Sequence, residues 1–399
     1  MDSITDEEKG IIEELRRLTI EDVTPKMLED VSLFYRFAKA RDFNLTQAEA
    51  MLRKHIAWRK EIKMDTILTE YEPPEVLKKY TPLSFTCFDK EGCAVLFHDL
   101  GRADAKGFNN VATNMEILKY VVYYVETCKD RVIKHGGNGK KRFELGKPIL
   151  SPIYDFDELT YSKAVNVKTL QLILLIVQTF IDNHPELLRI VTVINAPFYF
   201  TWMYSSLKHI LPSTVIRKVR IFGSDGWKEA LLEDIEADDL PVYLGGNRRD
   251  PDGNPFCESF MIRGQLIPKK YYMKKGRKNL SSEPDVEKIK LMPFCKEEIT
   301  FKVEEGNSFL EWEFQTSNRD IDFSLVFRGK SQEDFGLIEI IPKQRIDTTI
   351  EPEKGVIKCE KVGDYSIVFD NSNSWIHSKE VHYRAGIKSS KIKELLEST

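Results

Sequence analysis

The sequence lacks paired cysteines and any long apolar run. Its six cysteines are scattered over 399 residues without a Cys-x-x-Cys pair, which favours free thiols in a reducing compartment. The longest apolar candidate, 170–181, contains Gln171 and Gln178 and is shorter than the roughly 20 residues that cross a bilayer as a helix. Residues 1–8 are acidic and have no apolar core, so we expect no signal peptide. Together these absences predict a cytoplasmic protein.

A strong excess of charge of either sign is also missing. The formal net charge is −4, which argues against general nucleic-acid binding, because basic residues supply most of the affinity for phosphates. Hydrophobic residues make up 42% of the chain and charged residues 31%, as in ordinary globular proteins. At 399 residues the chain should hold two or three domains.

The motifs of common enzymes and metal sites are absent as well. Residues 223–226 (Gly-Ser-Asp-Gly) lack the spacing of a nucleophile elbow, and 136–141 lacks the first glycine and the Ser/Thr of a P-loop. The seven histidines show no metal-ligand spacing. Acidic pairs such as Asp155 and Asp157 are more typical of caps and turns than of acid–base chemistry. We therefore expect no catalytic residue, no metal, no cofactor and no enzyme activity.

The stretch 168–223 predicts a helix, a strand, a second helix and a second strand. Apolar residues recur at helical spacing over 170–181. Residues 189–195 are short and rich in β-branched side chains, as a buried parallel strand should be, and 219–222 has the same character. Two strands joined by a helical crossover imply a covered, mostly parallel sheet.

The second of these helices, 198–211, carries apolar side chains around nearly its whole circumference. A helix that covers one face of a sheet needs only one apolar stripe. One interpretation is a helix packed on several sides inside a large domain. The other is a lid over an apolar cavity, with one face on the sheet and another on a greasy ligand. Periodicity does not separate the two.

The rest of the chain before residue 250 is expected to be α-helical first and mixed afterwards. Residues 1–65 read as helices, and 46–49 (Thr-Gln-Ala-Glu) as the capping box that starts one of them. A Gly/Lys-rich loop is expected at 135–142. The other expected elements are a β-hairpin at 85–97, an amphipathic helix at 115–129, a buried strand at 148–156 and a helix at 227–235.

After residue 250 a connector is expected, followed by a change of pattern. The connector carries a basic run at 269–278, which reads either as a solvated linker or as a segment drawn to an anionic membrane. From 292 onward apolar residues alternate with polar ones in many short segments. This period of two, with turn signals between the segments, predicts a β-sandwich.

Several motifs in this order resemble the CRAL-TRIO lipid-binding family. They include Asn183-His184-Pro185-Glu186, Val193-Ile194-Asn195-Ala196-Pro197 and the strand that ends Lys218-Val219-Arg220-Ile221-Phe222-Gly223. Residues 36–43 and 51–60 resemble the helical module that precedes the domain in that family. Residues 250–255 and 268–272, followed by Phe369-Asp370-Asn371, resemble the subfamily with an added C-terminal GOLD domain.

The resemblance implies three structural parts and a linker. It implies an all-α module (1–70), an α/β lipid-binding domain with a mostly parallel sheet and a mobile gate helix (76–249), a linker (250–290), and an all-β, jelly-roll-like GOLD sandwich (291–388). It also implies cytosolic binding and transfer of phosphatidylinositol, tocopherol or a squalene-like isoprenoid.

Two sets of site residues follow from the resemblance. The candidate pocket walls are Tyr154, Phe156, Ile173, Val177, Val193, Phe198, Phe200, Met203, Leu207, Ile210, Ile221 and Phe222. The positions that match headgroup contacts in phosphatidylinositol-transfer members are Arg41, Glu186 and Lys218, where two cations can hold a phosphate and a carboxylate can accept inositol hydroxyls. Glu186 can equally pair with Arg41 or Lys218 for structure alone. His184 replaces the usual tyrosine and Lys39 the usual arginine.

The expected partners are one hydrophobic lipid, a membrane surface in transient contact, and no nucleic acid. One rival interpretation is a regulatory adaptor that docks a protein partner through the GOLD domain while lipid sets its conformation. A second rival is an α/β enzyme acting on a lipid, for which the sequence offers no catalytic constellation.

Overall fold

The structure is a computed structural model, and the chain in it divides into two compact units. It describes residues 4–164, 166–200, 204, 211–273, 280–304, 306, 308–317, 320–329, 337–348, 352–374 and 377–388. The N-terminal unit comprises 1–159 and 173–273, and the C-terminal unit comprises 160–172 and 274–399. The finer domain limits given above stay predictions.

The first part of the N-terminal unit is helical, as predicted. Its helices are α1 (Asp6–Thr19), α2 (Pro25–Leu28), α3 (Leu33–Lys39), α4 (Leu45–Glu61), η1 (Met64–Thr66) and α5 (Ile67–Glu70). Leu15, Phe37 and Leu52 come from three of these helices and are buried in one shared core. The capping box expected at 46–49 is wrong: Asn44 caps α4, its side chain accepting from Gln47 N at 3.0 Å.

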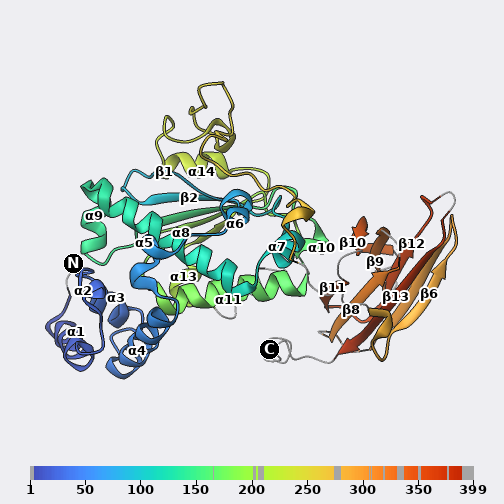
Figure 1. The fold of residues 1–399 in the computed structure, drawn as a ribbon, viewed down its shortest axis with the longest axis horizontal. Helices are drawn as coiled ribbons and strands as arrows, with labels where there is room; N and C mark the ends of the chain where they lie inside the picture. Colours follow the sequence, from blue (N-terminus) through green and yellow to red (C-terminus); the bar gives the residue numbers. More distant parts are fainter. Residues whose placement is uncertain are drawn as a thin grey trace. The chain divides into compact units, whose positions relative to one another are not determined.

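A five-stranded sheet forms the centre of this unit (Figure 1). Its strands, in spatial order, are β1 (Leu83–Phe88), β2 (Ala94–Asp99), β3 (Leu150–Asp155), β4 (Val191–Ile194) and β5 (Val219–Ile221). β1 and β2 form the predicted antiparallel hairpin. β2 to β5 run parallel to one another, which confirms the predicted parallel sheet.

Helices cover both faces of this sheet. The helices are α6 (Glu75–Tyr80), α7 (Ala105–Val111), α8 (Asn114–His135), α9 (Gly137–Glu144), α11 (Val167–Asn183), α13 (Ser213–Ile216) and α14 (Trp227–Asp234). In Figure 1, α14 lies on one side of the sheet, and α8 and α11 lie on the other. Leu96 and Leu150 pack with α8, whereas Phe97 and Ile153 pack with α14. Neighbouring residues of a strand therefore face opposite cores, as the pleat requires.

The Gly/Lys-rich loop expected at 135–142 is wrong, because most of this segment is helix α9. Gly136 ends α8 with a φ of 77° and separates the two helices. Phe143 is buried against the α8 face of the sheet, so tertiary packing outweighs the low helix propensity of the glycines. A Cβ at Gly139 would lie 2.2 Å from the carbonyl oxygen of Gly92, which explains a glycine inside this helix.

Part of the expected linker also belongs to the core. Phe256 and Met261 are buried with Trp227 of α14 on one face of the sheet, and Ile267 is 3% exposed. The segment has no regular period because it covers the sheet as an irregular chain held by side-chain contacts. The residues of the expected basic run that follow 273 lie outside the described residues.

The C-terminal unit contains two antiparallel sheets. Their strands are β6 (Glu287–Leu291), β7 (Lys296–Val303), β8 (Ser308–Thr316), β9 (Asp320–Gly329), β10 (Leu337–Asp347), β11 (Glu353–Cys359), β12 (Gly363–Asp370) and β13 (Lys379–Lys388). One sheet has the order β10-β9-β12-β7 and the other the order β11-β8-β13-β6. This interleaving of strands between two four-stranded sheets is the jelly-roll pattern.

Aromatic rings join the two sheets of this unit. Phe314 of β8 lies 5.1 Å from Phe323 of β9 and 5.0 Å from Phe369 of β12, between ring centroids. All three rings are buried. The predicted sandwich is therefore confirmed. In the described part of the whole chain, no helix is both long and apolar enough to cross a membrane.

Candidate lipid-binding site

One row of side chains crosses the sheet on the face that α8 covers. The strand register pairs His98 with Tyr154, Tyr154 with Val193 and Val193 with Ile221. Paired residues of adjacent strands project from the same face, so three of the predicted wall residues stand in one line next to His98. Val193 is 4% exposed and Ile221 is 43% exposed. The row therefore forms a floor that becomes more open toward β5.

Helix α11 presents an apolar stripe to the same face. Ile173, Val177 and Phe180 lie three or four residues apart, which puts them on one side of a helix. Phe180 packs against the core under Leu96 and Leu150, so the stripe points toward the sheet. Ile173 and Val177 are only half-buried. The floor row and this stripe together offer apolar surface on two elements.

The candidate headgroup residues lie in a cluster of opposite charges. Glu186 Oε2 lies 3.8 Å from Lys218 Nζ and 3.5 Å from Lys39 Nζ. Burial lowers the pKa of Lys218, although Glu186 opposes this. Arg41 donates instead to the carbonyl oxygen of Ala40 at 3.1 Å. The structure thus joins Glu186 to Lys218 and places Lys39, rather than Arg41, as the second cation.

Comparison with known families identifies the domain that contains this floor. The family model "CRAL/TRIO domain" matches residues 78–246. Residues 78–246 are therefore similar to this domain family. Domains of this family bind and transfer lipids.

The relatives match beyond this domain. "Protein ctg-1" of Caenorhabditis elegans is 25% identical over 361 residues, which cover 88% of this chain and 90% of the relative. "Protein real-time" of Aedes aegypti is 28% identical over 318 residues, or 76% of this chain but only 46% of the relative. Among solved structures, "Crystal structure of Sfh5" matches with a TM-score of 0.48 and 14% identity over 66% of this chain and 95% of that one.

The other predicted wall residues lie in different environments. Phe156 contacts Phe200, with ring centroids 4.8 Å apart, and Phe198 is 78% exposed. Phe222 is a correction: it packs against the α14 core, on the opposite face from Ile221, because successive strand residues alternate in direction. Three predicted wall residues, and most of the predicted gate helix, lie outside the described residues: Met203, Leu207 and Ile210.

His98 is a floor residue that the sequence did not indicate. Its ring lies 4.7 Å from Tyr154 and 6.5 Å from Tyr124, between centroids. Burial lowers the pKa of His98 to about 3 and raises that of Tyr154 to about 12, so both are neutral near pH 7. His98 Nε2 has no hydrogen-bond partner among the described residues. The only signal in the sequence was its position next to Phe97 at the end of the predicted hairpin.

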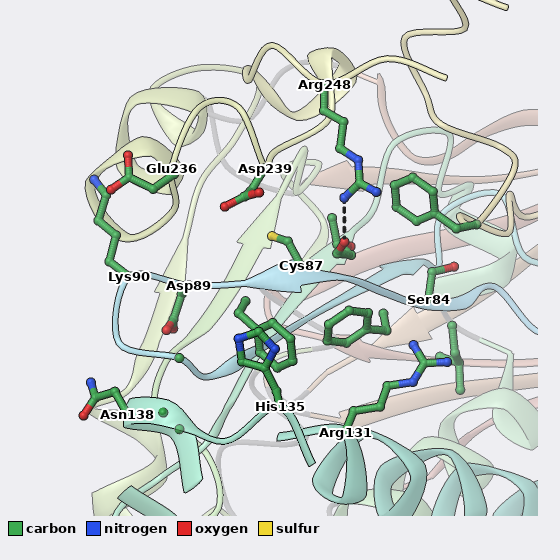
Figure 2. A pocket seen from close by; sticks show the side chains of 18 of the residues that line it. Ser84, Cys87, Asp89, Lys90, Arg131, His135, Asn138, Glu236, Asp239 and Arg248 are labelled. Carbon is green, nitrogen blue, oxygen red and sulfur yellow. Dashed lines mark hydrogen bonds between the residues drawn. The ribbon is translucent and has the colours of Figure 1, made fainter. Parts of the chain in front are cut away.

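A second hollow of the domain lies elsewhere and has a different character. An open cavity of about 950 Å³ surrounds the free edge of strand β1. Figure 2 shows Asp239 and Arg248 on one side of this strand, and Arg131 and His135 on the other. Arg248 donates to the carbonyl oxygen of Thr86 at 3.4 Å. The mixed charges of this cavity distinguish it from the apolar floor at His98, Tyr154 and Val193.

No cluster of histidine, cysteine or carboxylate side chains suited to a metal occurs among the residues that the structure describes. The cysteines at 87, 93, 128, 257 and 359 are buried and unpaired, and Cys295 is exposed and unpaired. Burial raises the pKa of the Cys87, Cys93 and Cys128 thiols to about 12, which makes these three poor nucleophiles near pH 7.

Proposed function

We propose that this protein is a carrier that takes one hydrophobic lipid into its CRAL/TRIO domain and transfers or presents it at membranes. The floor row at Tyr154, Val193 and Ile221 carries the proposal, together with the half-buried stripe of α11 that faces the same side of the sheet. In a core that needs no ligand, apolar side chains that face a sheet are normally buried more fully than these. An apolar ligand between the floor and the stripe would complete it.

The energetics favour a long apolar ligand. Burial contributes roughly 0.8 kcal/mol for each CH₂ group, so an isoprenoid or acyl chain can be held without a polar anchor. His98 adds one neutral polar atom to the floor, where it could accept a hydrogen bond from a lipid hydroxyl. The ligand classes compatible with this floor are phosphatidylinositol, a tocopherol and a squalene-like isoprenoid.

A substitution in the charged cluster would distinguish these ligand classes. Lys39 and Lys218 flank Glu186, which gives the cluster a net positive charge and a carboxylate acceptor, as an inositol phosphate requires. If the ligand is an inositol lipid, Lys218→Gln should lower its uptake at least several-fold. If the ligand is a tocopherol or an isoprenoid, the same substitution should leave uptake unchanged.

Lipid entry is assigned to the segment 198–211 as a gate. Its first residues are attached to the domain, because the Tyr199 hydroxyl donates to the carbonyl oxygen of Leu159 and Phe200 packs on Phe156. The protein would work in the cytosol, with peripheral and transient contact with membranes.

We assign the C-terminal unit as a GOLD domain that can hold a protein partner. The motif Phe369-Asp370-Asn371 supports this assignment. Phe369 lies in the core between the sheets. The Asn371 amide is buried and donates to carbonyl oxygens of Met292 (3.2 Å) and His377 (3.0 Å), which ties two loops together at one end of the sandwich.

Uptake of a fluorescent phospholipid or isoprenoid from vesicles tests the carrier function. Val177→Asp places a carboxylate on the stripe that faces the floor and should abolish uptake, since an ionised group would be left without a partner in an apolar site. Gln178→Asp places the same side chain at the next, exposed position of α11 and should keep uptake. Equal uptake by both folded variants would contradict the assigned pocket.

A further inference from the structure

Two Lys-Lys-Tyr segments that are far apart in the sequence lie side by side in the N-terminal unit. Lys78, Lys79 and Tyr80 end helix α6, and the other segment is η3 (Lys269–Tyr271). The ring centroids of Tyr80 and Tyr271 are 5.6 Å apart. The lysines of both segments are exposed. The tyrosine contact therefore gathers four ammonium groups on one surface.

Each tyrosine also holds a lysine over its ring. Lys79 Nζ lies 5.6 Å from the centroid of Tyr80, and Lys270 Nζ lies 5.0 Å from the centroid of Tyr271. The Tyr271 hydroxyl donates to Glu75 Oε1 at 3.3 Å, which links the two segments a second time. These contacts restrict the lysine side chains before any partner arrives, so less conformational entropy is lost on binding.

Leu266 shortly precedes Lys269 in the sequence, on a loop that is tied to the domain. The backbone N–H groups of Gly264 and Ile267 donate to Asp99 (3.1 Å) and Asp104 (3.0 Å). Ile267 is buried, whereas Leu266 is 80% exposed. In Figure 1 this region, coloured gold, lies next to α6 and α7. The loop therefore holds an exposed apolar side chain shortly before Lys269 in the sequence.

We propose that this surface docks the protein on an anionic bilayer; we call it the Lys-Lys-Tyr patch and define it by Lys78, Lys79, Lys269, Lys270 and Leu266. The lysines attract acidic headgroups, and Leu266 inserts at the level of the headgroups. The whole chain carries a net charge of −4, so the patch has the opposite sign to the molecule and would orient it at the membrane.

Acidic neighbours weaken the patch without cancelling it. Lys78 Nζ lies 3.8 Å from Glu72, and both side chains are at least half exposed, where such a pair contributes little. Glu75 is engaged by the Tyr271 hydroxyl. Glu72 and Glu75 thus offset part of the positive charge of the patch. The docking inference rests on the carrier function, since a carrier has to reach a membrane to exchange its lipid.

Flotation of the full chain with vesicles tests the patch. The probes are vesicles of phosphatidylcholine alone and vesicles with about 30% phosphatidylserine, a charge density high enough to attract basic segments. The variant K79Q/K270Q removes two charges from the patch and should weaken binding to the acidic vesicles about 25-fold, since each lysine near the surface contributes about fivefold. K60Q/K63Q removes two exposed lysines of the helical region and should bind as wild type. L266S should weaken binding without changing its dependence on salt.

The outcomes separate docking from lipid carriage. Loss of flotation in K79Q/K270Q with unchanged co-purified lipid supports the patch and the carrier together. If flotation depends on the patch but the purified protein holds no lipid, the docking proposal is supported and the proposed carrier function is contradicted. The proposal is overturned if wild type does not prefer acidic vesicles, or if K79Q/K270Q and K60Q/K63Q lose binding equally.

Discussion

Mild acid should unfold the N-terminal unit, because this unit buries three histidines in their neutral form. Burial lowers the pKa of His98 to about 3 and that of His184 to about 3, although Glu126 opposes the shift of His184. It also lowers the pKa of His55 to about 4, although the hydrogen bond that His55 Nδ1 donates to Asn183 Oδ1 opposes this. Their ordinary value is 6.5. As the pH falls below 6.5, the unfolded chain therefore takes up protons that the folded chain does not.

The size of the effect follows from these pKa values. Each histidine should destabilise the fold by about 1.4 kcal/mol per pH unit between pH 6.5 and its folded value. At about pH 5 the three together cost about 6 kcal/mol, which is comparable with the total stability of a typical domain, about 5–15 kcal/mol. Glu126 adds to the loss below pH 4.5: burial by itself would raise its pKa, but Lys129 at 3.0 Å lowers it to about 2.

Urea unfolding followed by tryptophan fluorescence from pH 7.5 to 5 measures this dependence. His184 packs on Phe180 with the two rings tilted and their centroids 5.1 Å apart, so His184→Phe keeps an aromatic ring and removes one titrating group. The slope of the unfolding free energy with pH should fall by about one third. His135 is exposed, and His135→Phe is the control that should keep the slope. A stability that does not change between pH 7 and 5, or equal slopes in both variants, would refute the account.

Two further predictions concern packing. Phe314→Ala removes a ring from the core between the sheets of the C-terminal unit and should cost about 3–5 kcal/mol of its stability, measured by urea unfolding, while lipid uptake by the other unit continues; unchanged stability would contradict the assigned core. Gly139→Ala should cost about 1–3 kcal/mol, because the new Cβ would meet the carbonyl oxygen of Gly92; an increase in thermal stability would show that α9 can move away.

The spacing of apolar residues was sufficient to predict the secondary structure where a segment carried a single clear pattern. Residues 170–181 repeat at helical spacing and form the central part of α11, and the β-branched run at 189–195 contains β4. The alternation that begins at Ile299 became two sheets with a shared aromatic core. In each case the side chains that set the pattern are those that the fold buries, and therefore local sequence and tertiary packing agree.

The errors occurred where distant contacts outweigh local preference. Phe143 packs in the core and stabilises a glycine-rich segment as helix α9. Phe256 and Met261 pack on the sheet and hold an irregular segment of the chain against it. Asn44 caps α4 in place of the expected Thr46. The contacts of Phe143, Phe256 and Met261 have no short-range signal, because they depend on what lies opposite in space. The Asn44 cap is a local contact to Gln47, and the error there was to choose Thr46 over Asn44 as the first residue of the cap.

The site was predictable as a set of apolar residues but not as a geometry. Tyr154, Val193 and Ile221 were expected as wall residues, but their alignment in one row depends on the register of β3, β4 and β5. The same register adds His98 and turns Phe222 to the other face. A strand pattern shows which residues alternate, whereas only pairing with a neighbour shows which face each one joins.

The central claim is that one hydrophobic lipid occupies the space between the sheet floor and α11. The most direct measurement is mass spectrometry of solvent extracts from the full chain purified without detergent, with lipid quantified against protein. The account predicts one lipid class at close to one molecule per chain, and its loss in Val177→Asp but not in Gln178→Asp. Absence of any lipid, together with no uptake from labelled vesicles, would contradict the claim and favour the adaptor.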